Sequence, residues 1–164
     1  MKGTMKCVVM TKPEPNSLEL WEKPIPEPAA NEVLVKVRAA AICGTDVHIR
    51  AWNEWTQKRM KPPVTIGHEF TGEVVEIGKD VKGVQVGDIV SAESHIPCNV
   101  CPDCRRGNRH VCQHTGLMGI TRDGGFAEYV TVPADIIYVA PKDVSYKTLA
   151  ILEPFGQAVH AVMD

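Results

Sequence analysis

Four cysteines in one short stretch of the chain have the spacing of a metal-binding array. They follow the pattern Cys-x2-Cys-x2-Cys-x7-Cys, so four of the six cysteines fall within fifteen residues: Cys98, Cys101, Cys104 and Cys112. Tetrahedral zinc with four thiolate ligands is held by short arrays of this kind. Prolines and polar residues among the cysteines predict turns, so a metal ion would hold a segment with too few apolar side chains to fold unaided. We therefore predict a structural zinc site in a lobe over residues 95–115.

A disulfide pair and an iron–sulfur cluster are the two other interpretations of these cysteines. Disulfides belong to oxidising compartments, and the apolar run near the N-terminus is too short for a secretory signal because Lys12 and Pro13 interrupt it. Iron–sulfur clusters use similar cysteine spacings, so that alternative stays open. Four thiolates leave no ligand position for a substrate, and a catalytic metal ion would have to lie elsewhere.

A second set of candidate ligands is dispersed along the chain. Cys43 stands where a predicted strand gives way to a helical turn opened by Gly44 and Thr45. His68 and Glu69 begin another predicted strand, which is framed by glycines that allow close backbone approach. Cysteine, histidine and a carboxylate are the ligands of an open catalytic zinc site. Spacing alone leaves a packing role for each residue open, because distant residues meet only if the fold brings them together.

For two tryptophans, one further cysteine and one histidine, the neighbouring sequence indicates a role less specifically. Trp52 and Trp55 lie in the otherwise polar segment 49–63, where they could wall a pocket or pack on the surface of the protein. Cys7 sits in an apolar strand pattern, which is typical of a small core residue. His95 follows a short predicted strand at the edge of the cysteine lobe.

The elements that must position these residues are mostly short strands. Thirteen glycines and twelve prolines punctuate segments rich in Val, Ile and Thr, which favours an all-β barrel. In residues 32–39 the valines alternate with charged side chains, so one face of this strand is predicted to be buried. We predict strands at 5–11, 17–22, 32–39, 68–78, 86–93, 124–132 and 135–140. Ser145 is predicted to cap a helix over 146–152 that breaks at Pro154, with a second helix following.

Length and charge limit the possible partners. The 164 residues are 44% hydrophobic, which suffices for the core of one domain. A net charge of -2, with no basic stripe, argues against nucleic acid as a partner. No apolar run approaches the roughly 20 residues that cross a bilayer, so we expect no membrane partner and a cytoplasmic location.

Taken together, the motifs resemble the N-terminal catalytic domain of zinc-dependent medium-chain dehydrogenases. The matching segments span nearly the whole chain: Ile42-Cys-Gly-Thr-Asp46, Gly67-His-Glu-Phe-Thr-Gly-Glu-Val-Val-Glu-Ile-Gly78, Val86-Gly-Asp88, the cysteine lobe and Gly125-Phe-Ala-Glu-Tyr129. The resemblance implies a mainly β fold, a GroES-like barrel over residues 1–152. Residues 153–164 would then begin the connection to a nucleotide-binding Rossmann domain, whose Gly-x-Gly-x-x-Gly motif does not occur in this sequence.

The resemblance also implies a catalytic zinc site. Cys43, His68 and Glu153 would bind the ion, with Glu69 either a ligand or its exchanging neighbour. Asp46 would accept the second ring N–H of His68 and so fix its tautomer.

Further roles are implied around that zinc ion. Thr45 and His48 resemble a proton relay to solvent, which suits a histidine because its free pKa is about 6.5. His95, Trp52 and Trp55 would face the substrate.

The implied activity is zinc-dependent, NAD-linked oxidation of a secondary alcohol, in a homo-oligomer when the enzyme is full length. Bound zinc lowers the pKa of water to roughly 7, and a coordinated alcohol should likewise lose its proton before passing a hydride to nicotinamide. L-threonine, giving 2-amino-3-oxobutanoate, is the first expectation, and a polyol or butanediol is the alternative. A non-catalytic zinc-binding barrel is the expectation if the chain naturally ends at 164, and this segment alone is expected to be inactive.

Overall fold

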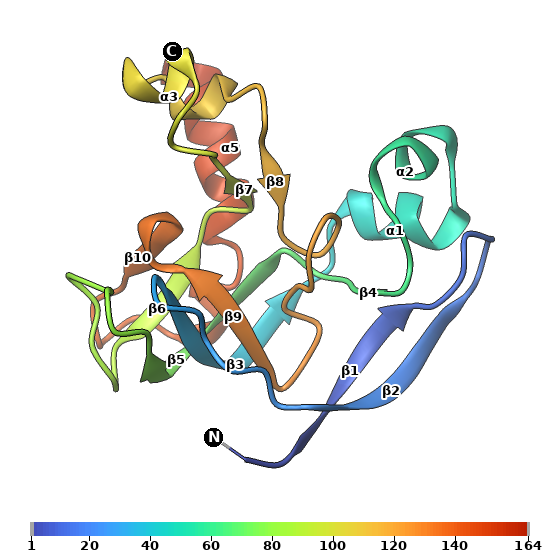
Figure 1. Cartoon of the computed structure of the whole chain (residues 1–164), viewed down its shortest axis with the longest axis horizontal. Coiled ribbons are helices and arrows are strands. Elements are labelled where there is room, and N and C mark those ends of the chain that lie inside the picture. The colour runs from blue at the N-terminus through green and yellow to red at the C-terminus, as the bar shows by residue number, and fades with distance from the viewer. Residues whose placement is uncertain (1, 164) are drawn as a thin grey trace.

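Residues 2–163 are described by the computed structural model, so Met1 and Asp164, the outer ends of the two predicted domain ranges, lie outside it. The fold is mainly β, as predicted (Figure 1). A five-stranded sheet has the order β10 (Ile137–Val139), β6 (Ile89–Ala92), β5 (Glu69–Ile77), β3 (Glu32–Ala41) and β9 (Tyr129–Pro133). A three-stranded sheet has the order β2 (Leu18–Pro24), β1 (Thr4–Met10) and β4 (Val64–Thr65), and β7 (His95–Ile96) pairs with β8 (Gly116–Leu117).

Short helices lie between and after the strands. They are α1 (Gly44–Ala51), α2 (Glu54–Arg59), α3 (Pro102–Arg105), α4 (Tyr146–Leu149), α5 (Leu152–Met163) and the 3-10 turns η1 (Arg109–Val111) and η2 (Ala134–Ile136). In Figure 1 the pair α1 and α2 lies on one side of the molecule, and the cysteine lobe with α3 extends on the other, beside α5. Among residues 2–163, no helix has the length and apolar character needed to span a bilayer.

The core confirms the alternation predicted for β3. Val33 and Val35 are fully buried in the main hydrophobic cluster, and Val37 packs against that cluster from a partly buried position. Leu34, which alternation would place on the opposite face, is also fully buried. The valine face of β3 is thus buried as predicted, but at Leu34 the strand is covered on its other face too, so the predicted exposed face does not extend to this position.

The register between β3 and β5 brings two candidate ligands together. The strands are antiparallel, with Ala41 opposite Glu69 at the end of β3 and the start of β5. Cys43 follows β3 by two residues, and His68 directly precedes β5. An extra residue, Arg38, interrupts the register in β3, and such a bulge bends a strand and re-aims the residues that follow.

Close contacts between glycine backbones fix the segment that precedes His68. Gly67 has a φ of +93, a conformation that side chains disfavour, and its carbonyl accepts a 2.8 Å hydrogen bond from the Gly125 N–H. A Cβ on Gly124 would lie 2.0 Å from the Gly67 oxygen and 2.6 Å from the Gly119 Cα. The chain before β5 is thus fixed by contacts that leave no room for a side chain.

Several predicted boundaries are wrong, each for a local reason. The strand predicted over 124–132 is regular only in β9, because residues 124–126 instead hydrogen-bond to residues 65–67. The polar segment 49–63 contains the unpredicted helix α2, whose first turn is capped by the Asn53 side chain accepting from the Thr56 N–H at 3.0 Å.

The break predicted at Pro154 is also wrong. The helix capped by Ser145 ends at Leu149, and α5 begins at Leu152, so Pro154 lies in the first turn of α5. Proline is tolerated there because the first backbone N–H groups of a helix have no intrahelical partner to lose.

We predict that Gly124→Ala lowers the free energy of unfolding by about 1–3 kcal/mol, because the new methyl group would force the Gly67 and Gly119 backbones apart. Urea denaturation of the two proteins measures the difference. Gly156→Ala is the matched control: no atom lies within 4 Å of its Cβ position, and alanine is favoured over glycine inside a helix by about 0.5–1 kcal/mol. Equal losses in the two variants would contradict the packing argument.

Candidate metal centres

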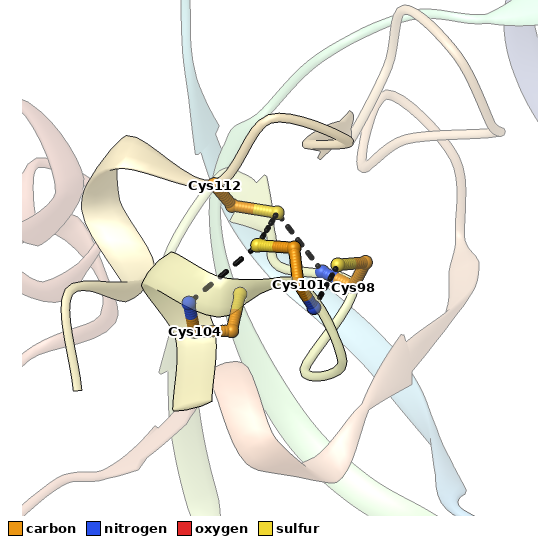
Figure 2. Close-up of side chains that lie close together, drawn as sticks. All are labelled: Cys98, Cys101, Cys104 and Cys112. Atoms are coloured by element: carbon orange, nitrogen blue, oxygen red, sulfur yellow. Dashed lines mark hydrogen bonds between the residues drawn. The ribbon is translucent and has the colours of Figure 1, made fainter. Parts of the chain in front are cut away.

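The four clustered cysteines converge in the lobe between β7 and β8. Their sulfur atoms all lie within 4.8 Å of one another, and Figure 2 shows the four side chains gathered at one point. Cys101 directly precedes α3, and Cys112 directly follows η1. The short helical turns, which were not predicted, allow residues close in sequence to direct their side chains to a common centre.

Backbone N–H groups donate to three of these sulfur atoms. The N–H of Cys98 lies 3.3 Å from the Cys112 sulfur, and the N–H of His114 lies 3.4 Å from the same atom. Cys98 accepts from the Cys101 N–H at 3.4 Å, and Cys101 accepts from the Cys104 N–H at 3.5 Å. Such hydrogen bonds stabilise the negative thiolate, which is the form that binds metal.

The same hydrogen bonds shift the acidity of the thiols. The Cys98 N–H lowers the pKa of Cys112 to about 6, and the Cys104 N–H lowers the pKa of Cys101. Burial, helped by the neighbouring thiols, raises the pKa of Cys104 to about 12. The lobe therefore favours the thiolate form of Cys101 and Cys112, two of the four sulfur ligands that would surround a cation.

The sulfur geometry distinguishes the interpretations left open by the sequence. The Cys101 and Cys112 sulfur atoms are 4.0 Å apart, whereas a disulfide needs about 2.05 Å, and all six cysteines within residues 2–163 are free. A tetrahedral ion with metal–sulfur bonds of about 2.3 Å places its sulfur atoms about 3.8 Å apart. An iron–sulfur cluster would separate the thiolates, because they bind different iron atoms. The lobe therefore fits a single tetrahedral ion.

A second cluster of candidate ligands lies where β3 ends and β5 begins. One ligand atom from each of Cys43, His68 and Glu69 lies within 4.8 Å of the other two. His68 and Glu69 are buried, and Cys43 is half-buried at the N-cap of α1. The strand register thus brings together three of the four residues predicted to bind a catalytic metal ion.

Two buried polar atoms beside this cluster have no hydrogen-bond partner among the described residues: Asp46 Oδ1 and His68 Nδ1. The predicted hydrogen bond between them is absent, and the Asp46 carboxylate accepts the Cys43 N–H through its other oxygen, Oδ2, at 2.9 Å. Burial raises the pKa of Asp46, against the opposing effects of the Cys43 N–H and of His68. A buried polar atom without a partner costs about 1–3 kcal/mol, so the unsatisfied imidazole beside a thiol and a carboxylate fits a metal ion.

Glu153 lies in a different group from the other predicted ligands. Its carboxylate, in the first turn of α5, accepts a 2.6 Å hydrogen bond from the buried hydroxyl of Ser94. With Glu93 and His95 it forms a third set of side chains whose ligand atoms lie within 4.8 Å of one another. Glu93 was not singled out from the sequence, although its place between a buried strand and His95 was a usable signal.

Four of the remaining predicted site residues lie on or just after α1, the helix that Cys43 caps. Thr45 and His48 are three residues apart on α1 and so share one helix face, with His48 exposed to solvent. Trp52 and Trp55 are partly buried against the hydrophobic cluster that includes Ile49. The tryptophans therefore contribute to packing, and their predicted contact with substrate stays a prediction.

The chain is similar in sequence to a known protein family and to named relatives. Residues 29–142 match the family model described as the alcohol dehydrogenase GroES-like domain. The chain is 50% identical over 164 residues to L-threonine 3-dehydrogenase of Caldanaerobacter subterraneus subsp. tengcongensis, covering 100% of this chain and 47% of that protein. It thus spans about half the length of the curated relatives that it matches.

Two solved structures show the same architecture. Galactitol-1-phosphate dehydrogenase from Escherichia coli superimposes with a TM-score of 0.87 at 32% identity, covering 96% of this chain and 44% of that one. A thermostable alcohol dehydrogenase from Pyrobaculum aerophilum with bound cobalt and zinc superimposes with a TM-score of 0.84 at 30% identity, covering 98% of this chain and 49% of that one.

We predict two zinc ions per chain, one in each of the first two clusters, measured by inductively coupled plasma mass spectrometry after gel filtration. Cys112→Ser and His68→Ala should each lower the content to one ion, and the double variant to none, because each removes a ligand of a different site. Cys7→Ala removes a buried thiol outside both clusters and should leave two ions bound. If Cys112→Ser and His68→Ala both leave the zinc content unchanged, the assignment of the ligands is wrong.

Proposed function

The chain belongs to the alcohol dehydrogenase GroES-like domain family, and we propose that it is the catalytic part of a zinc-dependent, NAD-linked dehydrogenase that oxidises L-threonine to 2-amino-3-oxobutanoate. The observation that carries this proposal is the convergence of Cys43, His68 and Glu69, a donor set that suits an open catalytic zinc site. The 50% identity to a relative named L-threonine 3-dehydrogenase supports the choice of substrate.

The reaction removes a hydride and a proton from one secondary alcohol. A zinc ion held by Cys43, His68 and Glu69 would supply a Lewis acid that makes the substrate hydroxyl more acidic. Thr45 and His48 would carry the hydroxyl proton to solvent, a route supported by their shared helix face and by the exposure of His48. NAD, when bound to the complete protein, would supply the acceptor for the hydride, and the carbinol carbon of the substrate would become the ketone carbon of the product.

Glu153 is proposed as a further ligand of the same ion. Its carboxylate accepts a hydrogen bond from Ser94, so it would have to release that hydroxyl to bind metal. Glu69 is the other carboxylate available, and it already lies in the cluster with Cys43 and His68. We therefore propose that Glu69 binds directly and that Glu153 exchanges with substrate or water.

The cysteine lobe is proposed to hold a structural zinc ion. Four thiolates saturate tetrahedral zinc, so no position is left for substrate. The lobe also contacts α5, since the rings of His110 and His160 meet edge to face with centroids 5.7 Å apart. A metal ion in the lobe would therefore stiffen one of the surfaces against which α5 packs.

We also propose that the complete protein is a cytoplasmic homo-oligomer without nucleic-acid or membrane partners. Six free cysteines suit a reducing compartment. The net charge of -2 argues against nucleic acid as a partner.

A polyol dehydrogenase is the second candidate. It is favoured by the similarity of the fold to galactitol-1-phosphate dehydrogenase at 32% identity. Both candidates use the same metal site, so only the groups around the substrate distinguish them.

We predict that the protein expressed from its complete gene oxidises L-threonine with a kcat/KM about 10²-fold or more above those for 2,3-butanediol and sorbitol. A site whose polar groups pair with an ammonium and a carboxylate rejects diols, which leave those groups unpaired. Steady-state NAD reduction measures the three values. A preference for sorbitol or butanediol would favour the polyol candidate, and no turnover of any alcohol would favour a non-catalytic zinc-binding domain.

We predict that His48→Gln in the same protein lowers kcat for L-threonine by about 10²-fold while the zinc content stays at its wild-type value, because the variant loses a proton carrier and no ligand. Arg50→Gln, an exposed change on the same helix, should leave kcat unchanged. Equal kcat values in the His48→Gln and wild-type proteins would remove His48 from the relay.

A further inference from the structure

Three consecutive residues that run from the end of β6 into the first residue of β7 form a hydrogen-bonded group that the proposed reaction does not use. Glu93 Oε1 lies 2.7 Å from His95 Nδ1 and 3.1 Å from the His95 backbone nitrogen. The hydroxyl oxygen of Ser94 lies 3.2 Å from the same Nδ1 and donates to Glu153 at 2.6 Å. His95 is therefore held through one ring nitrogen, by its two neighbours in sequence.

The protons of this group can be assigned by elimination. The single hydroxyl proton of Ser94 is directed to Glu153, so towards His95 the Ser94 oxygen can only accept. The ionised Glu93 carboxylate is also an acceptor only. Because both groups that face Nδ1 accept, Nδ1 carries the proton, and a neutral His95 ring has its lone pair on Nε2.

The electrostatics agree with this assignment. The hydrogen bond from His95 lowers the pKa of Glu93, and the same hydrogen bond raises the pKa of His95. Glu93 thus stays ionised, and it favours a proton on the nitrogen that faces it.

We propose that Glu93 is a positioning residue: it fixes the Nδ1–H tautomer of the neutral His95 ring, so that Nε2 accepts a hydrogen bond from the ammonium group of an amino-alcohol substrate. This inference rests on the proposed function and on the prediction, implied by the family resemblance, that His95 faces the substrate. Its chemical basis is that Nε2, Glu93 and Glu153 are all acceptors, and that an ammonium group offers donors only.

The surroundings of His95 favour an ammonium group over a further hydroxyl. Ligand atoms of Glu93, His95 and Glu153 lie within 4.8 Å of one another, which concentrates two carboxylates beside one imidazole. The side chains remain partly open to solvent, with 48% of His95 and 35% of Glu93 exposed. A cationic group can therefore approach without the cost of opening the core.

The first test measures the tautomer itself and needs no catalytic activity. Nitrogen-15 correlation spectra of the histidine rings are recorded on the 164-residue chain in alkaline buffer, which favours the neutral form of the rings. His95→Gln identifies the His95 signals among the six histidines. We expect the Nδ1–H tautomer in the wild type and in Glu93→Gln, which keeps an acceptor oxygen, and the Nε2–H tautomer to predominate in Glu93→Ala.

The second test measures specificity in the protein expressed from its complete gene. Glu93→Ala should raise KM for L-threonine about tenfold, with kcat/KM for 2,3-butanediol changed less than about twofold, because butanediol has no ammonium group. Glu93→Gln should restore KM to within about threefold of the wild-type value. Glu14→Gln, at an exposed acid 3.9 Å from Lys12, is the matched control and should change neither substrate's kinetics.

A double-mutant cycle separates positioning from a general loss of structure. If Glu93 acts through His95, then Glu93→Ala adds less than about twofold to the KM of His95→Gln. Additive effects, an Nε2–H tautomer in the wild type, or equal losses for threonine and butanediol would each overturn the proposal. A wild-type protein that has the Nδ1–H tautomer but does not oxidise L-threonine would instead overturn the proposed function.

Discussion

The antiparallel pairing of β3 with β5 is the constraint on which the candidate catalytic site depends. Ala41 pairs with Glu69, so Cys43 and His68, which lie just beyond the paired residues, are brought to the same end of the sheet. Gly67 maintains this arrangement, because its contacts with the 124–126 segment leave no space for a side chain. A slip of one register step would move the ligand side chains to opposite faces, so the main core and the site stabilise each other.

The ligands of the cysteine lobe are positioned by local contacts and not by the pairing of distant strands. Its four ligands come from one loop, and local N–H to sulfur hydrogen bonds orient them without help from the main core. Cys101 and Cys112 are buried, whereas Val100 and Val111 beside them are more than half exposed. The lobe therefore gains little from apolar burial, and a metal ion is the interaction that can hold its turns together.

This difference determines how much of each site could be predicted from the sequence. Spacing alone limits how far apart four cysteines within fifteen residues can lie, so the lobe was predictable. The meeting of Cys43 and His68 needs a strand register and a bulge that periodicity does not encode, and the resemblance to a family supplied it. The hydrogen bond predicted between Asp46 and His68 is absent although Asp46 Oδ1 has no other partner, because the sequence does not fix how two buried side chains are oriented towards each other.

The Ser94 hydroxyl lies between two acidic groups with different proposed roles: Glu153 as a metal ligand and Glu93 as the residue that positions His95. Its one proton is directed to Glu153, which accepts it at 2.6 Å, while a carboxylate oxygen of Glu93 lies 3.5 Å from the hydroxyl. If Glu153 moved to a metal ion, the hydroxyl would be free to turn towards Glu93 and so compete with the imidazole that Glu93 holds. The ligand set of the metal and the orientation of His95 would then depend on the same hydroxyl group, which links substrate recognition to the state of the metal site.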